Sequence, residues 1–112
     1  MKLLIVEDNK KMRELFKTLF KKNFDEFIEC EDGNEALNTY KRSMPDWVFM
    51  DVKMKSVDGI SATREIKNVF NDAKIIIVTD YGDDHLRKEA DLAGAFGYVL
   101  KENLQEILNI II

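Results

Sequence analysis

Short apolar runs alternate with amphipathic segments along the whole chain. A short apolar run bounded by polar residues is typical of a buried strand. Five such runs occupy residues 3–6, 27–30, 47–50, 75–78 and 98–100. Between them, apolar residues recur at helical spacing, most clearly at Met12, Leu15, Phe16 and Leu19 and at Leu104, Ile107, Leu108 and Ile111, and more weakly over 34–42, 59–70 and 84–93. The pattern predicts five strands and five helices in strict alternation.

Such alternation predicts a parallel sheet with right-handed crossovers, the doubly wound α/β class. Strands buried on both faces read as continuous apolar runs, which fits the first, third and fourth runs. The run at 27–30 alternates in polarity and the run at 98–100 is short and follows Gly97, so both are predicted to be edges. The order 2-1-3-4-5 satisfies these preferences and places ligands at the carboxyl ends of the strands, beside the switch point between strands 1 and 3.

Composition narrows the class of protein. The 112 residues are fewer than an average domain of about 150, so we predict a single domain over 1–112. The net charge of -4 gives no basic patch for a nucleic-acid backbone. A single cysteine, Cys30, cannot form an intrachain disulfide, and the longest apolar runs have four residues. We therefore expect a cytoplasmic protein with no direct nucleic-acid partner and no membrane segment.

Polar residues follow the central strands and should converge on one rim of the sheet. They are Glu7 and Asp8 after the first strand, Asp51 after the third, Thr79 after the fourth and Lys101 after the fifth. Crowded carboxylates repel one another unless a cation sits among them. Oxygen ligands, in a chain with one histidine and one cysteine, indicate Mg²⁺ rather than zinc. An aspartate beside Mg²⁺, with a lysine and a threonine across the pocket, is equipped to accept a phosphoryl group.

Four motifs at these strand ends carry a resemblance to a known family. They are Leu3-Leu4-Ile5-Val6-Glu7-Asp8-Asn9, Met50-Asp51-Val52-Lys53-Met54 with Asp58-Gly59, Ile76-Ile77-Val78-Thr79, and Gly94-Ala95 through Gly97-Tyr98-Val99-Leu100-Lys101. Together, over essentially the whole chain, they resemble the receiver domain of bacterial two-component response regulators. The resemblance implies a flavodoxin-like (βα)5 sandwich with a five-stranded parallel sheet.

The resemblance also implies a role for each residue of the rim. Asp51 would be the phosphoacceptor, and Lys101 would be the amine that contacts the phosphoryl group. Asp8 would bind Mg²⁺ directly, Glu7 would bind it through water, and the backbone carbonyl of Lys53 would be a further ligand. Thr79 would be the switch hydroxyl, and Tyr98 would be an aromatic that turns inward on activation. Such a domain is a signalling phosphoacceptor rather than an enzyme, and it catalyses only its own phosphoryl transfer and hydrolysis. Its Asp58-Gly59 pair is expected to cap the third helix.

Partners follow from the same resemblance. A sensor histidine kinase or phosphotransfer protein would supply the phosphoryl group, and an output domain or effector protein would receive the signal. The switching surface would consist of the fourth helix, fifth strand and fifth helix, and it could hold a phosphorylation-dependent homodimer. The domain would stand alone or form the N-terminal part of a longer regulator. The apolar end of the last helix predicts a covering partner or a continuing segment.

Three positions depart from the family pattern. Lys55 and Glu102 stand where proline is common, which predicts a looser loop after the third strand and a trans peptide bond at Glu102. Asp80 follows the switch threonine where a small residue is usual, so its carboxylate could shorten or lengthen the life of the phosphoryl group. Lysine followed by an acidic residue resembles receivers attached to four-helix helix-turn-helix DNA-binding domains.

Two alternatives stay open. A pseudo-receiver would share the fold and act through protein contacts without phosphorylation; the intact acidic set argues against it, while the three departures keep it open. A phosphatase of the haloacid-dehalogenase type also places an aspartate after a strand beside Mg²⁺, but its second aspartate would fall at Lys53. The sequence has no glycine-rich nucleotide loop. His85, Cys30 and Trp47 are interpreted as structural, His85 on the surface and the other two in the packing.

Overall fold

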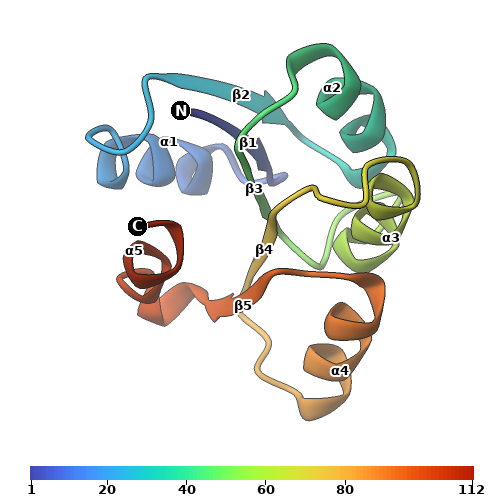
Figure 1. Cartoon of the computed structure of the whole chain (residues 1–112). Coiled ribbons are helices and arrows are strands. Elements are labelled where there is room, and N and C mark those ends of the chain that lie inside the picture. The colour runs from blue at the N-terminus through green and yellow to red at the C-terminus, as the bar shows by residue number, and fades with distance from the viewer.

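Five parallel strands form the centre of the molecule in the order β2-β1-β3-β4-β5 (Figure 1). The computed structural model describes residues 1–112. The strands are β1 (Lys2–Val6), β2 (Glu26–Cys30), β3 (Trp47–Met50), β4 (Ile75–Thr79) and β5 (Gly97–Leu100). The predicted strand order and the two predicted edge strands are confirmed. Central strands β1, β3 and β4 are buried almost throughout, as expected where helices cover both faces of a sheet.

Helices cover the two faces unequally. The helices are α1 (Lys10–Leu19), α2 (Ala36–Ser43), α3 (Gly59–Val69), α4 (Asp84–Ala93) and α5 (Glu106–Ile111), with 3-10 turns at Gly33–Glu35 and Lys101–Asn103. Figure 1 shows α1 and α5 on one face of the sheet and α2, α3 and α4 on the other. This is the predicted doubly wound α/β architecture, a flavodoxin-like fold.

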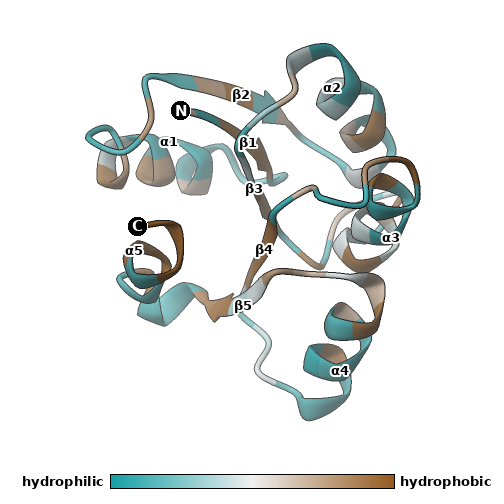
Figure 2. Cartoon of the chain, viewed as in Figure 1, coloured by the Kyte–Doolittle hydropathy of each residue, from teal (hydrophilic) through white to brown (hydrophobic).

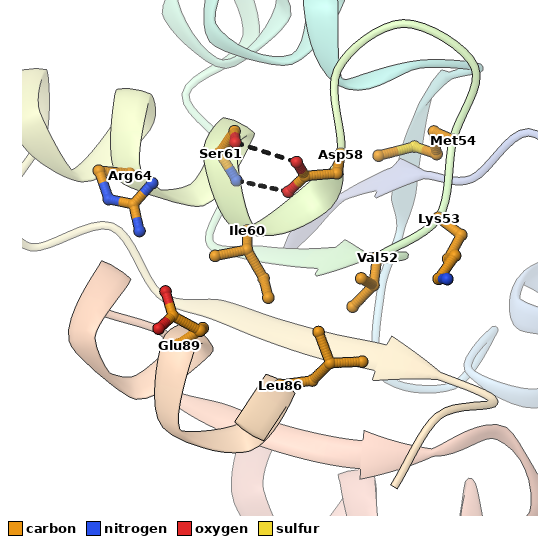
Figure 3. Close-up of a pocket in the computed structure, with 9 residues that line it drawn as sticks. All are labelled: Val52, Lys53, Met54, Asp58, Ile60, Ser61, Arg64, Leu86 and Glu89. Atoms are coloured by element: carbon orange, nitrogen blue, oxygen red, sulfur yellow. Dashed lines mark hydrogen bonds between the residues drawn. The ribbon is translucent and has the colours of Figure 1, made fainter. Parts of the chain in front are cut away.

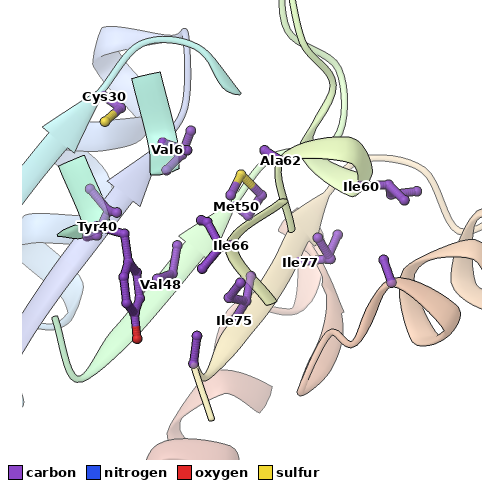
Figure 4. Close-up of a cluster of buried hydrophobic side chains, with 14 of the residues drawn as sticks. Val6, Cys30, Tyr40, Val48, Met50, Ile60, Ala62, Ile66, Ile75 and Ile77 are labelled. Carbon is purple, nitrogen blue, oxygen red and sulfur yellow. The ribbon is translucent and has the colours of Figure 1, made fainter. Parts of the chain in front are cut away.

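Each face of the sheet has its own hydrophobic core because successive side chains of a strand point to opposite faces. Along β1, Leu4 and Val6 join the cluster under α2, α3 and α4, part of which is drawn in Figure 4. Leu3 and Ile5 join the cluster under α1 and α5, where Phe49 packs against three phenylalanine rings. In Figure 2 the central strands are largely hydrophobic, whereas most helices mix hydrophobic and hydrophilic residues.

Two helices differ from the sequence prediction. The buried face of α1 is turned toward Arg13 and Phe16, so the predicted core positions Leu15 and Leu19 are 41% and 49% exposed. The periodic pattern could not distinguish these faces, because a leucine and a long arginine stem both satisfy helical spacing. The last helix begins at Glu106 rather than 104, because the chain first makes a 3-10 turn after β5. There Leu108 is 37% exposed.

Several local expectations are confirmed. Asp58 caps α3, since its side chain accepts a hydrogen bond from the backbone N–H of Ser61 at 2.9 Å. Every peptide bond is trans, including the one before Glu102. His85 is exposed on α4, while Cys30 and Trp47 are buried. None of the helices combines the length and the apolar character needed to cross a membrane.

Candidate functional site

The strand register brings the predicted polar residues to one rim. Val6 of β1 pairs with Met50 of β3, so Glu7 and Asp51 leave neighbouring strands side by side. The backbone N–H of Asp51 donates to the carbonyl of Val6 at 3.0 Å, which fixes this alignment. On the other side of β3, Thr79 ends β4 opposite Leu100 of β5, and Lys101 follows Leu100 directly. All five residues therefore lie at the carboxyl ends of the strands, where the fold was expected to place a site.

Three carboxylates and one amine meet at this rim. One carboxylate oxygen from each of Glu7, Asp8 and Asp51 lies within 4.8 Å of the other two. Glu7 and Asp51 are buried, and Asp8 is exposed. Lys101 Nζ lies 2.8 Å from Glu7 Oε1 and 3.5 Å from Asp51 Oδ1. Glu7 Oε1 is buried and forms this ion pair without a hydrogen bond from any backbone N–H. An oxygen-only ligand set with such an atom fits a hard divalent cation.

Burial and mutual repulsion alter the acid–base behaviour of the cluster. Burial raises the pKa of Glu7 to about 7, against the opposing effect of Lys101 and with a further rise from Asp51. Burial also raises the pKa of Asp51, and the charge of Lys101 opposes it. Burial alone would lower the pKa of Lys101, but its contact with Glu7 and the charge of Asp51 outweigh burial and raise it. The site therefore holds a charged lysine between two carboxyl groups that are reluctant to ionise together.

The threonine of the rim is tied to the loop that follows it. Thr79 is fully buried, and its Oγ1 accepts a hydrogen bond from the backbone N–H of Tyr81 at 3.2 Å. Tyr98 on β5 is half-buried, and its hydroxyl donates to the carbonyl oxygen of Tyr81 at 2.5 Å. Lys53 Nζ lies 4.8 Å from the centre of the exposed Tyr81 ring. Tyr81 therefore contacts both predicted switch residues and the loop that follows Asp51.

The loop after β3 is held by a neighbouring loop. Asp32 accepts hydrogen bonds from the backbone N–H groups of Ser56 at 2.9 Å and Val57 at 3.1 Å, and also from Asn34. These bonds lower the pKa of the Asp32 carboxyl although burial alone would raise it. At the end of the loop, a Cβ on Gly59 would stand 1.7 Å from the carbonyl oxygen of Asp51. The loop that lacks proline at Lys55 is thus fixed by side-chain acceptors and by close backbone packing.

Two cavities lie near the rim, one on each side. The larger of the two is not lined by Glu7, Asp8 or Asp51. It measures about 400 Å³ and lies between the β3–α3 loop and α4 (Figure 3). Val52, Ile60 and Leu86 supply its apolar surface, and Asp51 does not line it. A polar cleft of about 360 Å³ reaches Asp8 from the β2–α2 loop. The chemistry of the carboxylates, not cavity size, therefore identifies the candidate site.

The residues of the rim could be predicted from the sequence, but the residues that contact the backbone and loops next to it were missed. It predicted Glu7, Asp8, Asp51, Thr79 and Lys101, all of which the structure brings to the rim, with Lys53 and Tyr98 beside it. It did not predict that Arg13, Asp32 and Tyr81 support the rim. Arg13 had a usable signal, because it stands three residues before the buried Phe16 and the alternating strand β2 carries an acid at Glu29.

Comparisons with known proteins agree with this geometry. A family model described as the response regulator receiver domain matches residues 3–112. The chemotaxis protein CheY of Halobacterium salinarum is 41% identical over 99 residues, which cover 88% of this chain and 82% of that protein. The transcriptional regulatory protein YdfI of Bacillus subtilis is 38% identical over 109 residues, covering 96% of this chain and 51% of that protein.

Solved structures resemble the fold over nearly its whole length. The crystal structure of a LuxR-family two-component response regulator from an Aurantimonas species has a TM-score of 0.87 and 32% identity, covering 98% of this chain and 84% of that one. A LuxR-family DNA-binding response regulator from Staphylococcus aureus has a TM-score of 0.87 and 27% identity over 98% of this chain. The same fold therefore occurs in solved response regulators, one of which is described as DNA-binding.

Proposed function

Because the chain belongs to the receiver-domain family of response regulators, we propose that it accepts a phosphoryl group on Asp51 with the help of Mg²⁺. Receiver domains are signalling modules of two-component systems, and this assignment sets the class of reaction. The observation that carries the proposal is the convergence of Glu7, Asp8 and Asp51 within 4.8 Å, with Lys101 beside two of them. A sensor histidine kinase or a phosphotransfer protein would be the donor.

Asp51 is proposed as the nucleophile. Its Oδ1 accepts a hydrogen bond from the N–H of Val52 at 2.9 Å and faces Lys101, which leaves Oδ2 to attack the phosphorus. The new O–P bond forms as the P–N bond of a phosphohistidine donor breaks, and the donor leaves as imidazole. Lys101 would offset the negative charge of the transferred group.

Glu7, Asp8, Asp51 and the backbone carbonyl of Lys53 would hold the Mg²⁺ ion. When bound, the ion supplies positive charge that offsets the charge of the phosphoryl oxygens. The carboxylate set fits this ion because oxygen is its preferred ligand, and because the buried Glu7 Oε1 accepts no hydrogen bond from the backbone. Ionisation of Glu7, which burial opposes, would be favoured by the cation.

Phosphorylation is proposed to act on the surface formed by α4, β5 and α5. A phosphoryl group brings about -1.5 to -2 charges and strong acceptor oxygens. Thr79 would turn its hydroxyl toward them and give up the hydrogen bond from Tyr81, and Tyr98 would turn inward. The surface carries the exposed side chains of Leu92 and Phe96, 69% and 58% exposed, and would contact an output domain, an effector or a second copy. Any DNA contact would belong to an output domain.

Labelling with a small phosphodonor tests the acceptor. Incubation with acetyl phosphate and Mg²⁺ should raise the intact mass by one phosphoryl group, and Asp51→Asn should abolish the rise. Asp72→Asn, an exposed acid near the start of β4, is the matched control and should label like the wild type. A wild type that takes no label from small donors or from any histidine kinase would support the pseudo-receiver instead.

The switch needs its own test. Thr79→Ala should leave labelling of Asp51 largely intact while removing the effect of the label on association, measured by analytical ultracentrifugation. If the labelled wild type and the labelled Thr79→Ala protein associate equally, Thr79 does not carry the signal.

A further inference from the structure

We propose that Arg13, on the inner face of α1, is a positioning residue for the cation site, because it holds the backbone of both acidic residues that follow β1. The inference deepens the proposed function and rests on it. Arg13 is a charged residue with a side chain only 9% exposed, on a helix whose other basic residues are not buried. A guanidinium is kept inside a protein only where its donors are satisfied.

The guanidinium reaches the acidic loop through one of its nitrogens. Arg13 Nη1 donates to the carbonyl oxygen of Glu7 at 2.8 Å, inside the protein, and lies 3.3 Å from the carbonyl oxygen of Asp8. These contacts are with the backbone, and Arg13 forms no ion pair with either carboxylate. Arg13 therefore fixes the two peptide planes from which the ligand side chains branch, while the carboxylates stay free to face the site.

The other nitrogens of the guanidinium are held by β2 and the residues after it. Nε donates to Glu29 Oε1 at 2.9 Å, and Nη2 lies 3.6 Å from Glu31 Oε1. Lys17 Nζ contacts the second oxygen of Glu29 at 3.1 Å, which keeps that carboxylate in place. The rigid fork of arginine suits this bridge, because its three separate nitrogens reach acceptors on two sides, whereas the donors of an ammonium all radiate from one atom.

The bridge completes the attachment of the loop. From β2, the carbonyl of Cys30 accepts a hydrogen bond from the N–H of Glu7 at 3.0 Å. From within the loop, Glu7 Oε2 accepts one from the N–H of Asn9 at 3.1 Å. Without Arg13, the carbonyls of Glu7 and Asp8 would have no side-chain donor. Groups that orient metal ligands from behind typically contribute 10- to 100-fold to metal affinity.

Mg²⁺ titration of matched variants tests the inference without any phosphodonor. Arg13→Met keeps an apolar stem and removes the donors, and Lys17→Met removes a cation from the same helix and the same glutamate without touching the loop. MgCl2 is titrated into each protein while backbone amide NMR shifts report saturation, and urea unfolding in EDTA reports stability separately. We expect Mg²⁺ to bind 10- to 100-fold more weakly to Arg13→Met, and within twofold of wild type to Lys17→Met.

The outcomes separate the two proposals. If Arg13→Met binds Mg²⁺ as tightly as the wild type, the positioning role is wrong, whatever happens to stability. If the wild type itself does not bind Mg²⁺, the proposed cation site fails instead. Should Arg13→Met not fold, Arg13→Lys decides by the same titration: it keeps the charge but not the bridge, so we expect at least fivefold weaker binding, and wild-type affinity would overturn the inference.

Discussion

The two sides of the rim are built to different degrees of rigidity. On the acceptor side, which comprises the ends of β1 and β3 and the turn at Gly59, Glu7 and Asp51 are buried and lie 2.8 and 3.5 Å from Lys101 Nζ. On the signalling side, which comprises residues 80–83, α4 and β5, Tyr81 is 41% exposed and Tyr98 is half-buried. Chemistry that depends on position occupies the tightly packed side, and residues proposed to move occupy the loosely packed one.

The packing of α4 shows why the signalling side can respond. Its buried residues are Ala90 and Ala93, which have short side chains, and Leu92 points outward with 69% exposure. By contrast, α3 buries Ile60 and Ile66 against the sheet. Shifting α4 therefore uncovers less apolar surface than shifting α3, so it costs less free energy.

The largest expected loss of stability comes from adding one methyl group on the acceptor side, at Gly59. Gly59→Ala would place a Cβ 1.7 Å from the carbonyl oxygen of Asp51, which cannot be relieved without moving the acceptor. We expect a loss of about 4 kcal/mol or more in the free energy of unfolding, measured with urea. Gly82→Ala is the control on the signalling side, where the Cβ would meet only Leu100 methyl groups at 3.5 and 3.6 Å. It should be neutral or slightly stabilising, and equal losses would contradict the comparison.

The pH dependence of stability should come from the acceptor side. Without metal, the folded protein holds the proton of Glu7 up to a pKa of about 7, whereas the unfolded chain releases it near 4.5. The folded state therefore binds more protons in this window, so stability falls as pH rises from about 4.5 to about 7, by up to about 3 kcal/mol. The raised pKa of Asp51 acts in the same direction.

A single substitution isolates this effect. Glu7→Gln mimics the protonated acid, so in EDTA it should unfold at higher urea than wild type at pH 8 and show a flatter pH profile between 5 and 7. On the signalling side, burial raises the pKa of Tyr98 above its ordinary value of 10, outside this pH window. If the stability of the wild type in EDTA is constant from pH 5 to 7.5, the pKa of Glu7 is not raised by burial.

Mg²⁺ should stabilise the protein through the acceptor side alone. Binding to the folded state only adds about 2.7 kcal/mol at a hundredfold excess over Kd. The thermal midpoint should therefore rise in millimolar MgCl2 for the wild type and for Tyr98→Phe, and should stay unchanged for Asp8→Asn. A wild type with the same midpoint in MgCl2 and in EDTA would contradict the site.

The smallest effect is expected on the signalling side. Tyr98→Phe removes the hydroxyl that donates to the carbonyl of Tyr81 but keeps the ring that stacks under Arg87. We expect a loss of about 1 kcal/mol or less, since the freed carbonyl is near water. Tyr40→Phe is the control in the core, where the tyrosine hydroxyl makes no hydrogen bond, and it should change stability less. A loss of several kcal/mol for Tyr98→Phe would mean that this side is as rigid as the acceptor side.

Much of the fold and of the rim could be predicted from single residues and their spacing. Continuous apolar runs indicated β1, β3 and β4, and polar residues after strands located Glu7, Asp51 and Lys101 because parallel strands end at one rim. Helix faces were harder. Leu15 and Leu19 satisfied helical spacing yet lie outside, because the buried face of the helix is the one whose Phe16 packs against Phe49 of the sheet.

The sequence by itself determined the order of elements, the chemistry of the rim and the family resemblance, because these depend on local pattern and on residue type at strand ends. Only the tertiary structure decided what holds that chemistry in place. The contacts of Arg13 with Glu29, of Asp32 with Ser56 and of Tyr81 with Tyr98 join residues 16 to 24 positions apart. No periodicity encodes such pairs, since each arises where separate loops meet and buried polar groups must find partners.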